Sequence, residues 1–362
     1  MRDLNDPGTY SSLDASRLGD RIGQLPSQCL AAWEQSHDVP ILAPETSIRN
    51  VAIGGMGGSA IAGDLAADLV PYLCGIKAVP IVVVRDRQLP FPLDQHSLVI
   101  LCSHSGNTSE TLSLFRQATA SNAPVVVLAG GGRLTAEARE GGVPVLPIDL
   151  PGEPRTAVGY NLLLLLGLLQ QLGLVRVSDH TVDVATAALR QQVARLRPEV
   201  PAKNNPAKQL ARELVDKLVV VYGGGIFSGV ARRWKTQLNE NAKTWAFFET
   251  LPELLHNSVE AFGASRAIGE TIMAVVLQPK PGEAWLKWRY TVLTDLLHQN
   301  GIPHQMVEGA GGPPLTQLLS MLLLGDYVSY YLALLRGIDP SPTPAIVEAK
   351  ERLASPLAQP AE

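Results

Sequence analysis

The sequence predicts an α/β protein made of two doubly wound parallel-sheet units in tandem. Short runs rich in valine and isoleucine alternate with longer segments of helical period, glycine clusters follow several of these runs, and one such pattern occurs twice. Continuous apolar strands separated by helices form parallel sheets that helices cover on both faces. A chain of 362 residues has room for two such units.

The first unit is predicted to contain five strands, each leading into a turn and a helix. A helical leader over about 14–36 precedes them, and a helix from Val158 to about Leu174 closes the unit. The strands are the runs VAIGG, PIVVVRD, SLVILCS, PVVVLAGGG and VPVLPI. Their nearly continuous apolar character indicates that this sheet is buried on both faces.

The second unit follows a proline-rich segment, RLRPEVPAKNNPAKQ, which we interpret as a linker. The strand, glycine cluster and helix of 50–69 are echoed at 217–238 by KLVVVYGGGIFSGVARRWKTQL, and further strands are predicted at TIMAVVLQ and HQMVEG. The echo indicates two copies of one unit. The predicted division is a helical leader at 1–36, an N-terminal unit at 37–197, a linker at 198–207, a C-terminal unit at 208–353 and a loose tail at 354–362.

Composition argues against several classes of protein. A net charge of -4 provides no positive field for nucleic acid. Three distant cysteines, Cys29, Cys74 and Cys102, are predicted to be buried thiols in a reducing compartment. The N-terminus lacks an apolar signal region, and the apolar runs at 161–175 and 321–335 are shorter than the roughly 20 residues that span a bilayer. We therefore expect a soluble, cytoplasmic protein without nucleic-acid or membrane partners.

A glycine-rich turn, GGMGGSA, lies between a predicted strand and a predicted helix. Here Gly57, Gly58 and Ser59 can bring backbone amides and a helix N-terminus up to an anion. The alternative is that the glycines serve only tight packing of strand and helix. The spacing departs from G-x-G-x-x-G, because Ala60 stands three positions after Gly57, and no Gly-Lys-Ser/Thr ending follows, so dinucleotide and ATP binding are disfavoured.

A second turn, SHSGNTSETL, follows the strand SLVILC and begins another helix. Its hydroxyl groups, on Ser103, Ser105 and Thr108, are expected at the carboxyl end of the sheet, where open α/β sheets bind ligands. The alternative is a helix N-cap made by Asn107 or Thr108. Together with the glycine-rich turn, three hydroxyls without a lysine favour a small phosphate monoester.

These two turns resemble the phosphosugar-binding loops of sugar isomerase (SIS) domains, and the whole chain is similar to the bifunctional phosphoglucose/phosphomannose isomerases. The likeness runs from about residue 20 to 353, and the family has two SIS domains in tandem. It implies interconversion of glucose 6-phosphate or mannose 6-phosphate with fructose 6-phosphate through an enediolate, with no metal or organic cofactor. Three further segments carry it: EPRTAVGY at 153–160, QLNENAKTWAFFETLPELLHN at 237–257 and IDPSPTPAIVEAKERL at 338–353.

The resemblance also implies roles for individual residues. Glu240 matches the family's base, which moves a proton between adjacent carbons. His256 matches the histidine that opens the sugar ring and is supplied across a homodimer interface. Arg155 matches the arginine that stabilises the enediolate, and Lys350 matches a lysine that reaches the ring oxygen. Thr343 matches the threonine proposed to make room for both C2 epimers.

The chain departs from the family pattern at three positions and leaves other functions open. Leu255 replaces an asparagine, Ser258 replaces a glutamate and His104 replaces the usual aromatic residue, so epimer preference and rate stay undetermined. One alternative is a non-catalytic SIS protein that binds a sugar phosphate as a regulatory signal. Another is a nicotinamide-dependent enzyme with Asp86 as ribose ligand, for which the glycine spacing is wrong.

Overall fold

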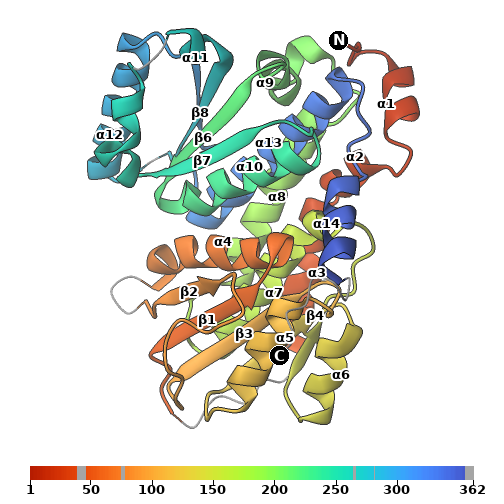
Figure 1. The fold of residues 1–362 in the computed structure, drawn as a ribbon, viewed down its shortest axis with the longest axis vertical. Coiled ribbons are helices and arrows are strands. Elements are labelled where there is room, and N and C mark those ends of the chain that lie inside the picture. Colours follow the sequence, from red (N-terminus) through yellow and green to blue (C-terminus); the bar gives the residue numbers. More distant parts are fainter. Residues whose placement is uncertain (39–45, 75–77, 264–265, 281, 355–362) are drawn as a thin grey trace.

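The structure, a computed structural model, describes residues 1–38, 46–74, 78–263, 266–280 and 282–354. Two parallel sheets lie one above the other in Figure 1, with helices between and around them. This arrangement confirms the predicted fold class of two doubly wound parallel-sheet units. Of the predicted tail, residues 355–362 lie outside the described part of the chain.

The first sheet has the strand order β2-β1-β3-β4-β5, and every pairing is parallel. All five predicted strand runs form, and β3 is buried along its whole length because helices cover both of its faces. The strands are β1 (Asn50–Gly55), β2 (Ile81–Val84), β3 (Ser97–Ser103), β4 (Val125–Ala129) and β5 (Val145–Pro147). The helices of this half are α4 (Gly57–Cys74), α5 (Ser109–Thr119), α6 (Gly132–Glu140), η2 (Pro154–Ala157), α7 (Val158–Gln171) and α8 (Asp179–Leu196).

The second sheet has the order β7-β6-β8-β9, again all parallel, and so repeats the arrangement of the first four strands. Its strands are β6 (Leu218–Gly224), β7 (Ala246–Leu251), β8 (Ile272–Gln278) and β9 (His304–Glu308). Three of these strands were predicted from the sequence, and β7 was not. The remaining helices are η3 (Ala202–Asn204), α9 (Pro206–Glu213), η4 (Gly225–Phe227), α10 (Ser228–Glu240), η5 (Glu253–His256), η6 (Ser258–Ala261), α11 (Arg266–Thr271), α12 (Ala284–Gln299), α13 (Pro314–Leu335) and α14 (Pro344–Ala354).

Three local details add to or differ from the predictions. The leader is helical and consists of three helices, α1 (Pro7–Leu13), α2 (Leu18–Gly23) and α3 (Leu25–Asp38), with Asp6 capping the first and a left-handed Arg17 preceding the second. The linker overlaps α9, whose first turn Asn205 caps with its side chain. Cys74 is only half-buried, and its thiol donates to the Leu174 carbonyl, whereas the other two cysteines are buried.

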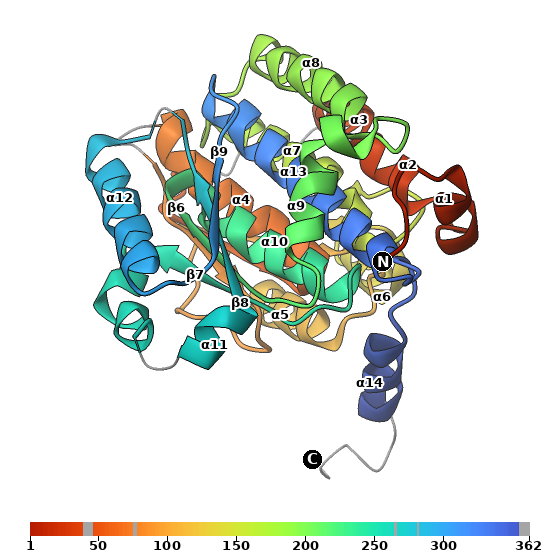
Figure 2. The same ribbon diagram turned by 90° about the horizontal axis from the view of Figure 1, so that it is seen from above.

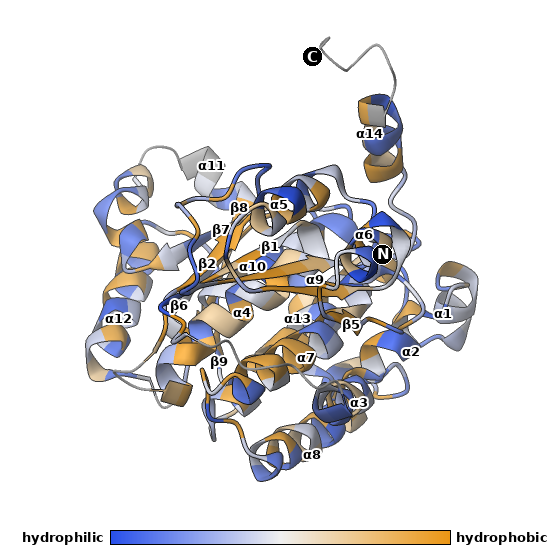
Figure 3. Ribbon diagram, turned by 90° about the horizontal axis from the view of Figure 1, so that it is seen from below, coloured by the Kyte–Doolittle hydropathy of each residue, from blue (hydrophilic) through white to orange (hydrophobic). Residues whose placement is uncertain are grey.

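One hydrophobic core runs through both halves and includes α7 and α13, which are strongly hydrophobic in Figure 3. Among the described helices, α13 is long and apolar enough to cross a membrane, yet 94% of that stretch is buried inside the protein. Its charged residue, Asp326, pairs with the buried Arg233 of α10 at 3.0 Å. The apolar run at 321–335 is therefore part of a buried helix.

Helices α4 and α10 join the two halves and run antiparallel. The Asp68 carboxylate, near the end of α4, accepts a 2.5 Å hydrogen bond from the Gly229 backbone amide at the start of α10. The end of α10 consequently lies near the start of α4. This packing brings Glu240, the last residue of α10, toward the glycine-rich turn that begins α4.

Candidate active site

The glycine-rich turn joins β1 to α4 at the carboxyl end of the first sheet. Gly57 starts the helix with φ of 50°, a conformation that suits glycine. A methyl group added to Gly58 would lie 3.1 Å from the Pro154 carbonyl oxygen and 3.4 Å from the Arg155 Cα. The turn is therefore in close contact with the segment that carries Arg155.

The hydroxyl-rich turn joins β3 to α5, and its serine hydroxyls accept hydrogen bonds from amides of the same turn. The Ser103 hydroxyl accepts from the Gly106 amide at 3.0 Å and lies 3.4 Å from the Thr108 hydroxyl. Thr108 occupies the N-cap of α5 without capping it through its side chain, and Ser105 is exposed. The first-turn amides of α5 are thus open to an anion, so the N-cap alternative explains this turn less well than a phosphate site does.

Ser59 connects the two turns. Its hydroxyl, almost fully buried at the start of α4, accepts a 3.2 Å hydrogen bond from the His104 amide in the other turn. All six predicted binding residues of the two turns therefore meet at one edge of the sheet, as the parallel order of β1 and β3 requires. The arrangement provides many neutral donors, which suit a phosphate monoester.

Arg155 is buried, and two distant parts of the chain hold its guanidinium. It donates from Nε to Asn241 Oδ1 at 2.8 Å, and from Nη2 to the carbonyls of Pro340 at 3.1 Å and Ser341 at 2.7 Å. Burial lowers the pKa of Arg155, and the nearby Glu240 carboxylate acts in the opposite direction. An arginine remains protonated under such conditions, so the site contains a fixed positive charge.

Glu240 lies beside this charge. Its Oε2 is 3.9 Å from Arg155 Nη1, and the carboxylate is only partly buried. Among the described residues, no hydrogen bond engages that carboxylate. A loosely paired, accessible carboxylate next to a fixed cation can accept a proton while the cation stabilises negative charge developing on a substrate.

Lys243, which was not predicted from the sequence, holds the backbone of Glu240 through a hydrogen bond to its carbonyl. Its ammonium contacts four backbone carbonyls, those of Glu240 at 2.9 Å, Asn241 at 3.2 Å, Asp339 at 3.1 Å and Pro340 at 3.2 Å. Burial, followed by repulsion from Arg155, lowers the pKa of Lys243 to about 8. This lysine thereby fastens the end of α10 to the segment that precedes α14.

Three predicted residues are not assembled with Glu240 in this chain. His256 is exposed in η5, beyond the far end of β7. Lys350 is exposed on α14, which projects from the body in Figure 2. Thr343 is half-buried two residues after Ser341, close in sequence to the carbonyl that accepts from Arg155.

We expect Ser105→Ala and Thr108→Ala each to weaken binding of a phosphorylated sugar acid by about 1 to 3 kcal/mol, because each removes a donor to a charged phosphate. Turnover at saturating substrate should change less than affinity. Isothermal titration measures the effect, and Ser109→Ala, whose hydroxyl donates to Glu110, is the matched control. Unchanged affinity in both variants would contradict the phosphate assignment.

We expect Lys243→Met to lower kcat by about 10- to 100-fold with little change in KM, because a displaced Glu240 loses its alignment. The wild-type kcat should fall as pH rises through about 8, where the ammonium loses its proton. Between pH 8 or so and the ordinary pKa of 10.5, Lys243 binds more protons in the unfolded chain than in the folded chain. Its contribution to the free energy of unfolding therefore rises with pH, so loss of this proton does not unfold the protein.

The measurement for this prediction is a pH profile of kcat, with Lys235→Met, on α10, as control. The methionine variant should lack the alkaline limb near pH 8, and Lys243→Arg should recover part of the rate with that limb moved to higher pH. An identical alkaline limb in the Lys243→Met variant would assign it to another group.

Comparisons with known proteins point to one family. Residues 203–353 match the family described as the bacterial phospho-glucose isomerase C-terminal SIS domain. A bifunctional phosphoglucose/phosphomannose isomerase from Caldicellulosiruptor bescii is 34% identical over 336 residues, which cover 92% of this chain and 98% of that protein. The chain belongs to the bifunctional phosphoglucose/phosphomannose isomerase family.

A further relative supports this assignment, and a solved structure supports the fold. The bifunctional phosphoglucose/phosphomannose isomerase of Aquifex aeolicus is 30% identical over 308 residues, or 85% of this chain and 91% of that protein. The crystal structure of a glucose-6-phosphate isomerase like protein from Thermus thermophilus superimposes with a TM-score of 0.62 at 21% identity, covering 97% of this chain and 99% of that one. The structural likeness supports the fold.

The departures from the family pattern lie in two places. His104 sits in the hydroxyl-rich turn, where burial lowers its pKa and its Nδ1 is buried without a partner among the described residues. Ser258 donates to Glu249 and to Asn257, and Asn257 donates in turn to Glu253 at 2.9 Å. The region after His256 is thus stabilised by a local network that uses a serine in place of the family's glutamate.

Proposed function

We propose that this protein isomerises glucose 6-phosphate and mannose 6-phosphate to fructose 6-phosphate and back. The approach of the Glu240 carboxylate to the Arg155 guanidinium at 3.9 Å, beside the glycine-rich turn, carries this proposal. Family membership supports it, because relatives along nearly the whole chain bear this double name.

In the proposed mechanism, the phosphate loops anchor the substrate and Glu240 transfers the proton. The carboxylate removes the C2 proton of the open aldose, and the released electron pair forms the C1–C2 double bond of an enediolate as O1 becomes negative. Arg155 stabilises that negative charge. The O1 oxygen takes up a proton, the proton on O2 is released as C2 becomes a carbonyl, and Glu240 returns its proton to C1. Anchoring converts binding energy into alignment of C1 and C2 with the carboxylate.

We further propose that the active enzyme is a homodimer in which the partner's His256 opens the sugar ring. Glu240 ends α10 at the amino end of the second sheet, whereas His256 follows β7 at its carboxyl end. A strand of this length separates the two by roughly 20 Å, which is too far for both to contact one sugar. A His256 supplied by a second chain could contact the same sugar as Glu240.

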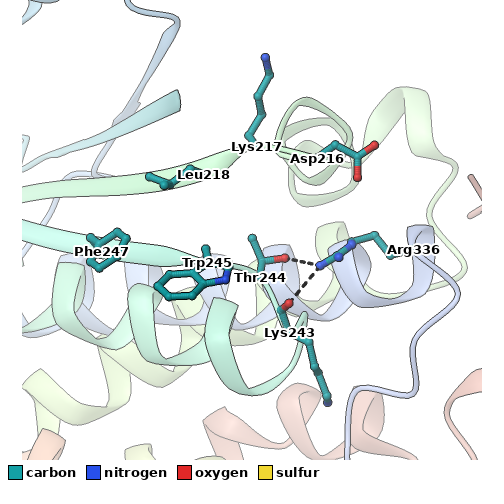
Figure 4. A pocket seen from close by; sticks show the side chains of 8 residues that line it. All are labelled: Asp216, Lys217, Leu218, Lys243, Thr244, Trp245, Phe247 and Arg336. Carbon is teal, nitrogen blue, oxygen red and sulfur yellow. Dashed lines mark hydrogen bonds between the residues drawn. The ribbon is translucent and has the colours of Figure 1, made fainter. Parts of the chain in front are cut away.

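The edge strand β7 offers a surface for such a partner. Trp245 is 75% exposed and Phe247 is 46% exposed, and Figure 4 shows both rings side by side on this edge. Arg336 fixes the start of the strand by donating to Thr244 and to the Lys243 carbonyl, while the Lys243 side chain extends away from the rings. Exposed aromatic side chains on an unpaired strand edge are typical of subunit interfaces.

Two further parts of the proposal concern domains and location. The N-terminal domain, 37–197, supplies the phosphate loops and Arg155, and the C-terminal domain, 208–353, supplies Glu240 and His256. We place the protein in the cytoplasm, because three free cysteines suit a reducing compartment. The substrate is a small sugar phosphate, and the reaction requires no metal or cofactor.

The direct test is incubation with glucose 6-phosphate and, separately, mannose 6-phosphate in the presence of EDTA. Both should yield fructose 6-phosphate, and the reaction in ²H₂O should introduce deuterium, because a carboxylate base exchanges its proton with solvent. Binding without turnover would identify a regulatory SIS protein instead. Turnover only after adding a nicotinamide cofactor would favour the redox alternative.

A further inference from the structure

A pocket of about 1000 Å³ lies outside the candidate active site. Its walls are the leader, the segment between α8 and α9, and α9 itself, so the first part of the predicted linker lines it. Its lining contains apolar groups, including Pro7, Pro198 and the ring of Tyr10. It also contains three cationic side chains, those of Lys203, Lys208 and Arg212. We call it the leader pocket.

The floor of the leader pocket is held rigidly by Lys208. This fully buried lysine donates from Nζ to the carbonyls of Leu4, Pro198 and Val200, at 2.6 to 2.9 Å. The ring of Tyr10 lies over the same ammonium at 5.3 Å. A flat aromatic surface is thereby fixed beside a buried positive charge.

Two further cations at the leader pocket have no counter-ion. Lys203 and Arg212 are exposed, and neither side chain forms an ion pair or hydrogen bond with another described residue. The acidic residue of the lining, Glu199, is instead paired with Arg197 at 3.6 Å. The pocket therefore has a surplus of positive charge in a protein whose net charge is -4.

We propose that the leader pocket binds a small organic anion with a flat or apolar body. Lys203 and Arg212 would contact its anionic group, whether phosphate, sulfonate or carboxylate, and Tyr10 and the prolines would pack against its body. This site is separate from the candidate active site. Its volume suits a metabolite-sized ligand.

The leader connects this pocket with the candidate active site. Beyond Tyr10, the Ser16 hydroxyl contacts the hydroxyl of Ser341, whose carbonyl accepts from Arg155. Arg21 pairs with Glu153 at 2.7 Å, two residues before Arg155. A ligand that orders the leader would thus also restrict the two segments that contact the leader and position the Arg155 guanidinium.

The test titrates the full-length protein with 1-anilinonaphthalene-8-sulfonate while a phosphorylated sugar acid saturates the active site. Lys203→Gln/Arg212→Gln should weaken probe binding about tenfold, equivalent to about 1.4 kcal/mol. Arg139→Gln/Lys287→Gln, which removes the same charge from exposed sites elsewhere, should leave the titration unchanged. Adenosine monophosphate should displace the probe more effectively than either adenosine or inorganic phosphate.

Three results would overturn the proposal. The first is equal probe affinity in the wild type and the Lys203→Gln/Arg212→Gln variant, with both shown to be folded by circular dichroism. The second is loss of probe binding in Trp245→Ala, which would place the probe on the aromatic edge of β7. The third is failure of the phosphorylated nucleoside to compete better than phosphate, which would show that the body of the ligand is not recognised.

Discussion

Glu240→Gln is expected to lower kcat for both aldose phosphates by about 10²- to 10⁴-fold, because an amide cannot accept the C2 proton. The amide keeps the size of the side chain, so the Arg155 guanidinium and its partners, Asn241, Pro340 and Ser341, should keep their positions. Affinity for a phosphorylated sugar acid should therefore stay close to that of the wild type. Steady-state kinetics and isothermal titration measure the two effects separately.

A matched control for this experiment is Glu213→Gln, an exposed glutamate of α9. It changes the net charge equally and should leave kcat unaffected. Deuterium incorporation from ²H₂O should fall together with kcat in the Glu240→Gln variant. Near-normal turnover in that variant would remove Glu240 from the proton transfer and with it the proposed mechanism.

His256→Ala should also be nearly inactive on the closed sugar, yet mixing it with Glu240→Gln should restore activity. Each homodimer lacks one required group in both sites, whereas a mixed dimer has one site with both wild-type residues. Random exchange of equal amounts makes about half of the dimers mixed, so recovery should approach roughly a quarter of wild-type activity. The separation of Glu240 and His256 by the length of β7 is the structural reason for this expectation.

This mixing experiment needs proof that subunits exchange, for example by mass spectrometry of differently tagged chains. His298→Ala, an exposed histidine on α12, should be fully active alone and is the control for histidine loss. A monomer by light scattering at working concentration, or no recovery after verified exchange, would show that His256 does not act across an interface.

The strands of the first sheet could be predicted because they are nearly continuous apolar runs, and the central strand β3 is buried along its whole length. Strand β7, AFFETL, gives no such signal, since as an edge strand it has partly exposed residues along its middle. The split leader was equally hidden, because it depends on a left-handed Arg17, a conformation that the residue type does not indicate.

The loops of the candidate site were predictable because each follows a strand directly in the sequence. Lys243 was not, since its significance depends on the carbonyls of Asp339 and Pro340, almost a hundred residues further along the chain. Local sequence gives no information about such a pairing. The family resemblance indicated the types of residue at Glu240 and His256, but the position of each at one end of β7 emerges only from the fold.

The guanidinium of Arg155 joins segments that the ribosome makes at very different times. Its partner Asn241 is 86 residues later, and Pro340 is 185 residues later, close to the end of synthesis. A nascent chain that has completed its first sheet therefore has the glycine-rich and hydroxyl-rich turns, but neither the Glu240 carboxylate nor the carbonyls that hold Arg155. The hydrophobic core also runs through both halves, so the candidate site is complete only in the finished chain.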